Sequence, residues 1–209
     1  MSLAIPLYTG YERSYAWNGG NPLPAHLFEI RPPTLPWAAR PIHDEVLGCV
    51  IGYQEIVSGF SRTFDLEGKY VSLSEPGLEA PLLDPFDAIL VVGGIWKAGV
   101  RGLVGAGTRS AGAAISGVTL MGLRTRFHAL SRQPLRFAEK PLQHMGNPDR
   151  FVPVHILRLA IRHGRRTPDP RGYRGLFMYT VPMIRHGRQR TLEVLVREGD
   201  YTVLHFLYK

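Results

Sequence analysis

The chain has 209 residues, 44% hydrophobic and 20% charged, so it can bury a core as one domain or as two small ones. Cys49 is the single cysteine, which excludes an internal disulfide and a cysteine-based zinc cluster. The formal net charge of +8 favours a polyanionic partner without identifying one. The N-terminus, Met-Ser-Leu-Ala-Ile-Pro, lacks the basic and long apolar parts of a Sec signal peptide, so we expect export, if any, by another route.

The positive charge is confined to the C-terminal part of the chain. Residues 1–123 contain eight basic and eleven acidic side chains, a net charge of −3, whereas residues 124–209 contain seventeen and six, a net charge of +11. Most of these basic residues are arginines, whose planar guanidinium suits phosphate, and the same segment holds six of the eight histidines. A solvated basic surface and a face that binds a nucleic-acid backbone both fit this pattern.

Residues 1–85 are predicted to form an N-terminal region whose role the sequence does not reveal. Residues 1–45 are rich in Pro, Gly and aromatic side chains, which predicts irregular chain with short extended pieces. Apolar runs at 46–51 and 69–73 indicate short strands, or one strand and a short helix. The acidic balance of residues 1–120 suggests a shield for the basic segment, or contact with a secretion apparatus or chaperone.

Residues 86–123 form an apolar connector that is rich in Gly and Ala. A membrane-spanning helix needs about 20 mostly apolar residues, and Lys97, Arg101 and Arg109 interrupt this stretch, so a packed helical hairpin or a flexible connector fits better. Small residues at every third or fourth position are also typical of helices that associate in membranes. A membrane-active toxin that works through this segment is therefore one alternative.

The basic segment 124–209 is predicted to fold as an α+β domain that begins with a helix. Apolar residues at helical spacing, Pro153 at the start and Gly164 at the end predict a helix over 154–163. Its buried stripe is expected at Leu157, Ala160 and Ile161. Its opposite, exposed face is expected at His155, Arg158 and Arg162.

Three strand-like runs follow the helix, over 176–184, 190–196 and 201–208. A link rich in turn residues, 167–172, joins the helix to the first of them. Short turns between neighbouring strands predict antiparallel hairpins, and a helix before such a meander predicts a helix packed on one face of an antiparallel sheet.

Side-chain alternation along these strands places His205 on the uncovered face of the sheet. The core side is expected to carry Leu192, Val194, Val196, Leu204, Phe206 and Tyr208. The open side is expected to carry His205, Val203, Leu207, Thr191 and Glu193. Such a face with nearby arginines suits metal-independent RNA cleavage, because histidine titrates near pH 7 as base or acid and cations stabilise the phosphorane formed by attack of the 2′-oxygen.

An ordered series of short motifs carries a resemblance to a toxin group. The motifs are Arg-Phe-Val-Pro at 150–153, Ala-Ile-Arg-His-Gly at 160–164, Pro-Asp-Pro-Arg-Gly at 168–172, Leu-Glu-Val-Leu at 192–195 and His-Phe-Leu-Tyr at 205–208. This series resembles the C-terminal toxin domains of contact-dependent inhibition proteins and other polymorphic toxins, which belong to the barnase–EndoU–colicin–RelE-like (BECR) ribonucleases. The resemblance covers about the last 70 to 80 residues.

The resemblance implies a BECR-like α+β fold and a ribonuclease, often directed at tRNA, that needs no cofactor. It also implies a cognate immunity protein, which we expect to be acidic. Since the chain is short and starts with Met, it resembles a stand-alone effector of a type VI or similar injection apparatus, secreted without a signal peptide and active in the cytoplasm of a competitor cell.

The resemblance and the predicted sheet face together define a candidate site. His205 is carried over as a catalytic residue with its His-Phe-x-Tyr strand, and the further catalytic candidates are Glu193, Arg150 and Thr180. The candidate substrate-binding residues are Arg158, Arg162, Arg185, Arg188 and Arg190. Additional candidates are His144, His155 and Tyr208. We expect no metal ligands. A DNase fits less well, since no metal-binding His/Asp cluster of familiar spacing, such as a His-Asn-His motif, is present. A non-catalytic module that binds RNA or DNA is the other alternative.

Overall fold

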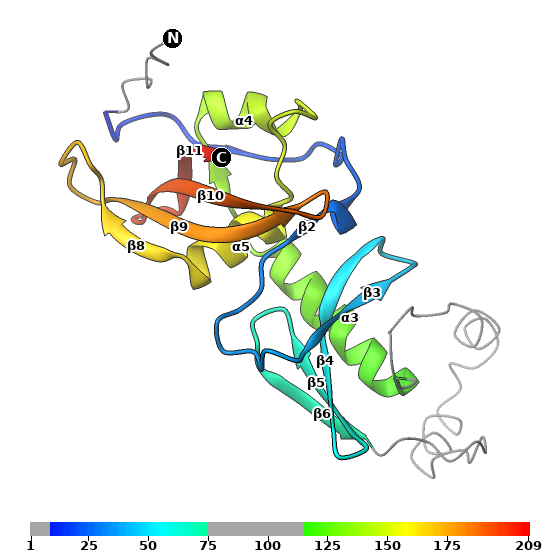
Figure 1. Ribbon diagram of the computed structural model, residues 1–209. Helices are drawn as coiled ribbons and strands as arrows, with labels where there is room; N and C mark the ends of the chain where they lie inside the picture. The colour runs from blue at the N-terminus through cyan, green and yellow to red at the C-terminus, as the bar shows by residue number, and fades with distance from the viewer. Residues whose placement is uncertain (1–8, 75–114) are drawn as a thin grey trace. The chain divides into compact units, whose positions relative to one another are not determined.

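The computed structural model describes residues 9–74 and 115–209, which form a mixed α+β protein (Figure 1). Its contacts divide the chain into two compact units, Met1–Pro33 with Phe127–Lys209, and Thr34–Arg126. The connector predicted over 86–123 lies outside the described residues up to residue 114, and its last part begins helix α3 (Gly117–Arg132). Within the described ranges, no helix is both long and apolar enough to cross a membrane.

The smaller unit contains a four-stranded antiparallel sheet in the order of the sequence. Its strands are β3 (Arg40–Asp44), β4 (Cys49–Val57), β5 (Phe60–Asp65) and β6 (Tyr70–Ser74). The run at 46–51 starts in the turn before β4 and continues into that strand, and the run at 69–73 lies mostly in β6. The alternative of one strand with a short helix was therefore wrong. The turn before β4 is closed by Asp44, whose carboxylate accepts hydrogen bonds from the Val46 and Leu47 amides at 2.8 and 3.1 Å.

Two ion pairs attach α3 to this four-stranded sheet. Arg124 donates to the buried Asp44 carboxylate, with Nε 2.5 Å from Oδ2, and Arg126 donates to Asp65 at 3.1 Å. Burial alone would raise the pKa of Asp44, but the hydrogen bond and charge of Arg124 hold it below its usual value.

The larger unit is built on a sheet in the order β1–β7–β11–β10–β9–β2, with β8 also paired with β9. Its strands are β1 (Tyr15–Ala16), β2 (Phe28–Glu29), β7 (Arg136–Phe137), β8 (Arg165–Pro168), β9 (Leu176–Arg185), β10 (Arg188–Arg197) and β11 (Thr202–Tyr208). All pairs are antiparallel except β7 with β11. The antiparallel meander β9–β10–β11 confirms the three predicted strands.

The N-terminal residues, where composition predicted short extended pieces, contribute two short strands to this sheet. Their pairing with the C-terminal strands was not predicted. β1 pairs with β7, and β2, which follows a short 3-10 helix at Ala25–Leu27, pairs with the end of β9. Phe28 and Ile30 are each 1% exposed. The Phe28 ring packs edge-on against Phe151 with the ring centroids 5.9 Å apart, so this segment is part of the core of the larger unit.

Helix α5 (Val154–His163) confirms the predicted helix and contacts β9 and β10. Leu157 and Ala160 are fully buried as expected, whereas Ile161 is only partly buried. The predicted exposure of His155 was wrong, because the Phe127 ring of α3 lies 5.1 Å from the His155 ring and His155 is 5% exposed. A helix that packs against two neighbours buries more than one stripe of side chains.

Gly164 ends α5 by a close approach and not by a left-handed turn. Its φ is −69° and its amide donates to the Ala160 carbonyl at 2.8 Å. A Cβ at this position would lie 2.4 Å from that carbonyl oxygen and 3.3 Å from the backbone N and O of Thr180. Glycine therefore allows α5 to run into β8 directly against the backbone of β9.

A β-bulge in β11 changes which side chains face the core. Leu195 pairs with His205 and Val196 pairs with Val203, so Leu204 is the extra residue between them. The predicted place of Val203 on the open face was wrong, because Val203 lies opposite Val196 and is fully buried. Leu204, predicted on the main core side, instead joins a second buried cluster with Ala138, Leu176 and Leu195. The face that carries His205 is therefore apolar and covered at one end.

Candidate functional site

The candidate site lies where helix α4 (Glu139–Met145) passes strand β11. β7 pairs with β11 only at Thr202 and Val203, and the chain then runs from β7 into α4, which contacts both strands. Figure 1 shows α4 next to β11 in the larger unit. This path brings His144 of α4 to His205, with the ring centroids 6.4 Å apart, and to Phe206, with the centroids 5.7 Å apart.

Arg150 completes one side of this histidine pair. It lies in the loop after α4, which is closed by hydrogen bonds from the Arg150 amide to the Asn147 carbonyl and from the Asp149 amide to the Asn147 side chain. Its Nη1 is 3.4 Å from Nε2 of His144. Because a guanidinium only donates, Nε2 of His144 accepts, and the proton of the neutral ring is on Nδ1. That atom is buried without a partner among the described residues.

Glu193 and Lys209 lie on the His205 side of the sheet. Glu193 pairs with Leu207 and Leu195 pairs with His205, so alternation puts Glu193 and His205 on one face. Nζ of Lys209 is 2.9 Å from Oε1 of Glu193. Lys209 was not predicted, although it follows His205 and Leu207 at alternate positions and could have been found from that spacing.

The pKa values of both histidines are lowered. Burial is the largest cause for His205, whose pKa falls to about 4, and the nearby His144, Arg150 and Lys140 lower it further while Glu193 raises it. The pKa of His144 is lowered by burial and by the charges of Arg150 and Lys140. Burial and positive neighbours therefore favour the neutral form of both imidazoles in the free protein, which is the form that a general base requires.

Tyr208 and Arg185 attach the loop that carries Arg150 to the sheet. The Tyr208 hydroxyl donates to the Asp149 carbonyl, and Nη2 of Arg185 donates to the Pro148 carbonyl at 3.1 Å. The Arg185 guanidinium also lies 4.5 Å from the centroid of the Tyr208 ring. Burial raises the pKa of Tyr208, although the positive charge of Arg185 opposes this. These two predicted residues therefore hold Arg150 in position and do not face His205.

The other predicted residues are distributed over the same unit. Thr180 pairs with Glu193 across β9 and β10 and so shares its face, whereas Arg188 and Arg190 are exposed on the β9–β10 hairpin. Arg162 is exposed near the end of α5.

Two predicted residues on α5 are engaged elsewhere. Arg158 donates to the carbonyls of Gln133, at 3.1 Å, and Pro134. His155 is buried, which lowers its pKa to about 4 and keeps it from any substrate. Among the described residues, no group of three or more His, Cys, Asp or Glu side chains is placed to hold a metal ion.

Comparison with protein-family models, with curated proteins and with solved structures finds no match to this chain. The α+β class is established by the structure itself. The likeness to BECR ribonucleases rests on the motif series and stays a prediction.

Proposed function

We propose that the larger unit is an endoribonuclease in which His144 and His205 act as an acid–base pair on one phosphodiester. The observation that supports this most directly is the meeting of two imidazoles from separate elements, 6.4 Å apart, with the Arg150 guanidinium 3.4 Å from one of them. A base, an acid and a fixed cation are what cleavage by an internal 2′-hydroxyl needs.

The charges around each ring assign the roles. Burial and the charges of Arg150 and Lys140 keep His144 neutral, as a base requires. In this assignment the substrate phosphate takes over the Arg150 guanidinium from Nε2 of His144, and the freed lone pair of Nε2 accepts the proton of the 2′-hydroxyl. The 2′-oxygen forms a bond to phosphorus, and the bond from phosphorus to the 5′-oxygen breaks. Burial and the charges of His144, Arg150 and Lys140 hold His205 neutral in the free protein, and only Glu193 favours its protonated form. The acid role therefore depends on the negative charge of the bound phosphate, which stabilises the protonated ring that gives its proton to the leaving 5′-oxygen. Arg150 and Lys140 stabilise the charge on the phosphorane.

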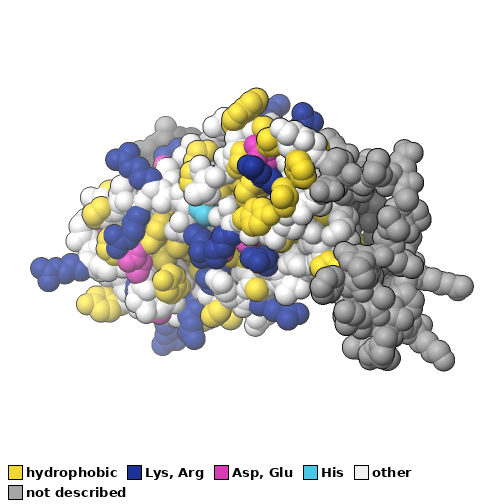
Figure 2. Space-filling view, turned by 90° about the horizontal axis from the view of Figure 1, so that it is seen from below, with side chains coloured by type: hydrophobic (Ala, Val, Ile, Leu, Met, Phe, Trp, Pro, Cys, Tyr) yellow, Lys and Arg dark blue, Asp and Glu magenta, His cyan; other side chains and the backbone are white. Residues whose placement is uncertain are grey.

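The charge and fold of the unit are consistent with RNA as the substrate. Figure 2, which draws the whole chain, shows more Lys and Arg than acidic side chains on the face seen from below. Residues 124–209 carry a net charge of +11, and the exposed Arg162, Arg188 and Arg190 supply contacts for a phosphate backbone. A helix beside an antiparallel meander also fits the BECR arrangement, so we propose tRNA as target, delivery into a competitor cell and an acidic immunity protein as inhibitor.

The test is incubation of the purified full chain with total RNA in the presence of a chelator. We expect fragments that end in 2′,3′-cyclic phosphate and 5′-hydroxyl groups. His144→Ala and His205→Ala should each lower the rate about 10²- to 10⁴-fold, the usual contribution of a general acid or base. His128→Ala, an exposed histidine on α3, is the matched control and should keep the full rate. Intact RNA would favour a non-catalytic binding module. Cleavage at the normal rate by a variant that carries both His144→Ala and His205→Ala would contradict the roles assigned here.

A further inference from the structure

A separate pocket of about 490 Å³ lies in the larger unit, beside β1 and β7. It is lined by Ala16–Asn18, by Ser131–Phe137 and by Val154. This volume falls within the range of about 300 to 1,000 Å³ that is typical of small-molecule sites. None of the residues proposed above for catalysis lines it, so the pocket belongs to no site described so far.

The aromatic wall of the pocket is the indole of Trp17, held by Gly19. A Cβ at Gly19 would lie 2.4 Å from Cη2 and 2.5 Å from Cζ2 of Trp17, so the ring packs directly on the glycine backbone. Nε1 of Trp17 is buried without a partner in the part of the chain that the structure describes, and the same holds for Oγ of Ser131. Two polar groups in this wall thus have hydrogen-bonding capacity left over.

The pocket is also lined by two arginines. Arg132 and Arg136 line it, and no described carboxylate lies within 4.0 Å of either guanidinium. Nη1 of Arg136 donates to the Ser14 hydroxyl at 3.3 Å, which leaves its other donors available. Arg158 donates a hydrogen bond to the carbonyl of Gln133, which lines the pocket, and so brings a third positive charge close to it.

We propose that this pocket binds one nucleotide of a single-stranded stretch of the RNA substrate, with the base on Trp17 and its phosphate on Arg132 and Arg136. Aromatic faces combined with arginines are the groups that bind single strands, because every base can stack and every nucleotide carries a phosphate. Two exposed tyrosines near Arg136 supply further stacking surfaces. Tyr15 precedes Ala16 of β1, which pairs with Arg136, and the Tyr201 carbonyl accepts a hydrogen bond from the Arg136 amide.

The pocket is connected to the histidine pair by the strand they share. Arg136 and Phe137 pair with Thr202 and Val203, and Val203 precedes His205 by two positions in β11. In this assignment the bound RNA runs from the pocket past β11 toward the proposed catalytic groups. This assignment rests on the proposed ribonuclease function. It gives that ribonuclease a preference for unpaired RNA.

The experiment measures binding apart from cleavage, with the full chain and a short labelled single-stranded DNA as probe. DNA lacks the 2′-hydroxyl and is not cut. Trp17→Ala should raise the Kd about 5- to 150-fold, the equivalent of ~1–3 kcal/mol for one stacked base. Gly19→Ala, which displaces the ring and keeps the indole, should raise the Kd in the same direction. Trp37→Ala, at a tryptophan that is 93% exposed in the other unit, is the matched control and should leave the Kd unchanged.

Two further measurements separate this assignment from others. Arg132→Gln and Arg136→Gln should each reduce the slope of log Kd against log salt by about 0.7, the value for one lost phosphate contact on a single strand. Duplex DNA and adenosine 5′-monophosphate should bind more weakly than the single strand.

An unchanged Kd in both Trp17→Ala and Gly19→Ala would overturn the assignment, as would equal binding of the free nucleotide. If the single strand binds in a Trp17-dependent way but wild-type protein leaves RNA intact, the proposed catalytic function fails and the pocket does not. A His205→Ala variant that binds normally but does not cut would support both.

Discussion

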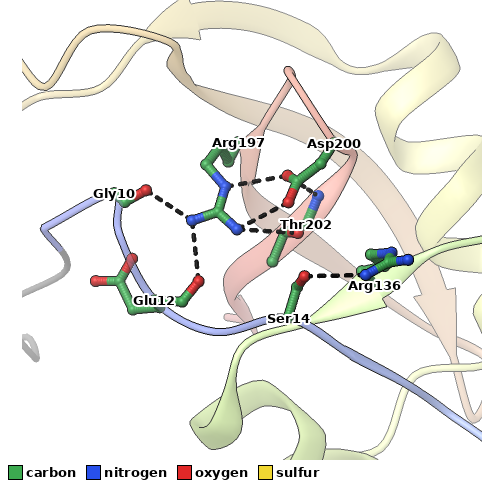
Figure 3. A network of polar contacts seen from close by, with 7 residues as sticks. All are labelled: Gly10, Glu12, Ser14, Arg136, Arg197, Asp200 and Thr202. Atoms are coloured by element: carbon green, nitrogen blue, oxygen red, sulfur yellow. Dashed lines mark hydrogen bonds and ion pairs between the residues drawn. The ribbon is translucent and has the colours of Figure 1, made fainter.

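The guanidinium of Arg197, at the end of β10, donates a hydrogen bond to the carbonyl of Gly10 at 2.6 Å (Figure 3). The same group donates to the Glu12 carbonyl at 3.1 Å and pairs with the Asp200 carboxylate at 2.8 Å. Arg197 thus ties the N-terminal segment to the turn between β10 and β11. The pKa of Asp200 is lowered to about 2, mainly by its hydrogen bond with Arg197.

Replacing Arg197 with Met should therefore release the N-terminal segment before it affects the rest of the sheet. Hydrogen bonds to a charged group contribute about 1.5–3 kcal/mol each, so we expect a loss of about 2 kcal/mol or more in the free energy of unfolding. Hydrogen exchange of the amides in residues 9–16 should accelerate. Arg188→Met, at an exposed arginine on the same strand, serves as the control. Unchanged exchange in the Arg197 variant would show that other contacts hold the segment.

The buried N-terminal phenylalanine gives a second prediction. Phe28→Ala should cost about 3–5 kcal/mol of unfolding free energy, because Phe28 is 1% exposed and packs against Phe151. Tyr11→Ala, at a side chain that is 91% exposed, should change stability little.

By the same reasoning, a fragment of residues 124–209 should unfold at lower denaturant concentration than the full chain, because it lacks Phe28. Equal unfolding midpoints would contradict the place of Phe28 in the core.

The lowered pKa values of the two histidines predict an acidic optimum for RNA cleavage. The ratio kcat/KM reports the free protein, where the pKa of His205 is about 4 and burial and positive neighbours lower that of His144. His205 loses its proton above about pH 4, so once His144 is also neutral kcat/KM should fall about tenfold per pH unit. Glu193→Gln removes the charge that raises the pKa of His205 and should move the optimum to lower pH. A profile that rises up to pH 8 would contradict these roles.

The buried His155 predicts how stability depends on pH. Burial lowers its pKa from 6.5 to about 4, so the unfolded chain binds more protons between these values and stability falls as the pH falls through this window. From pH 7 to pH 5 this one group should cost about 2 kcal/mol. His155→Leu should reduce the loss measured by denaturant titration at the two pH values, whereas His128→Leu, at an exposed site, should not. An equal loss in both variants would locate the pH dependence elsewhere.

Several parts of the larger unit were predictable because they depend on local sequence. Helix α5 and strands β9, β10 and β11 were predicted correctly, since periodicity of 3.6 or 2 and the turn residues between the runs are local signals. The place of Glu193 on the His205 face follows from the same alternation.

Contacts between distant segments determined the rest. The bulge at Leu204 reverses the side-chain order of β11, and only its pairing with β10 reveals it. His155 is buried because α3 brings Phe127 against it, and His144 meets His205 because β7 pairs with β11. The sequence by itself determined helix α5, strands β9 to β11 and most of the candidate residues. The tertiary structure decided which of them meet, because hydrogen-bond register and burial depend on partners that are far apart in the chain.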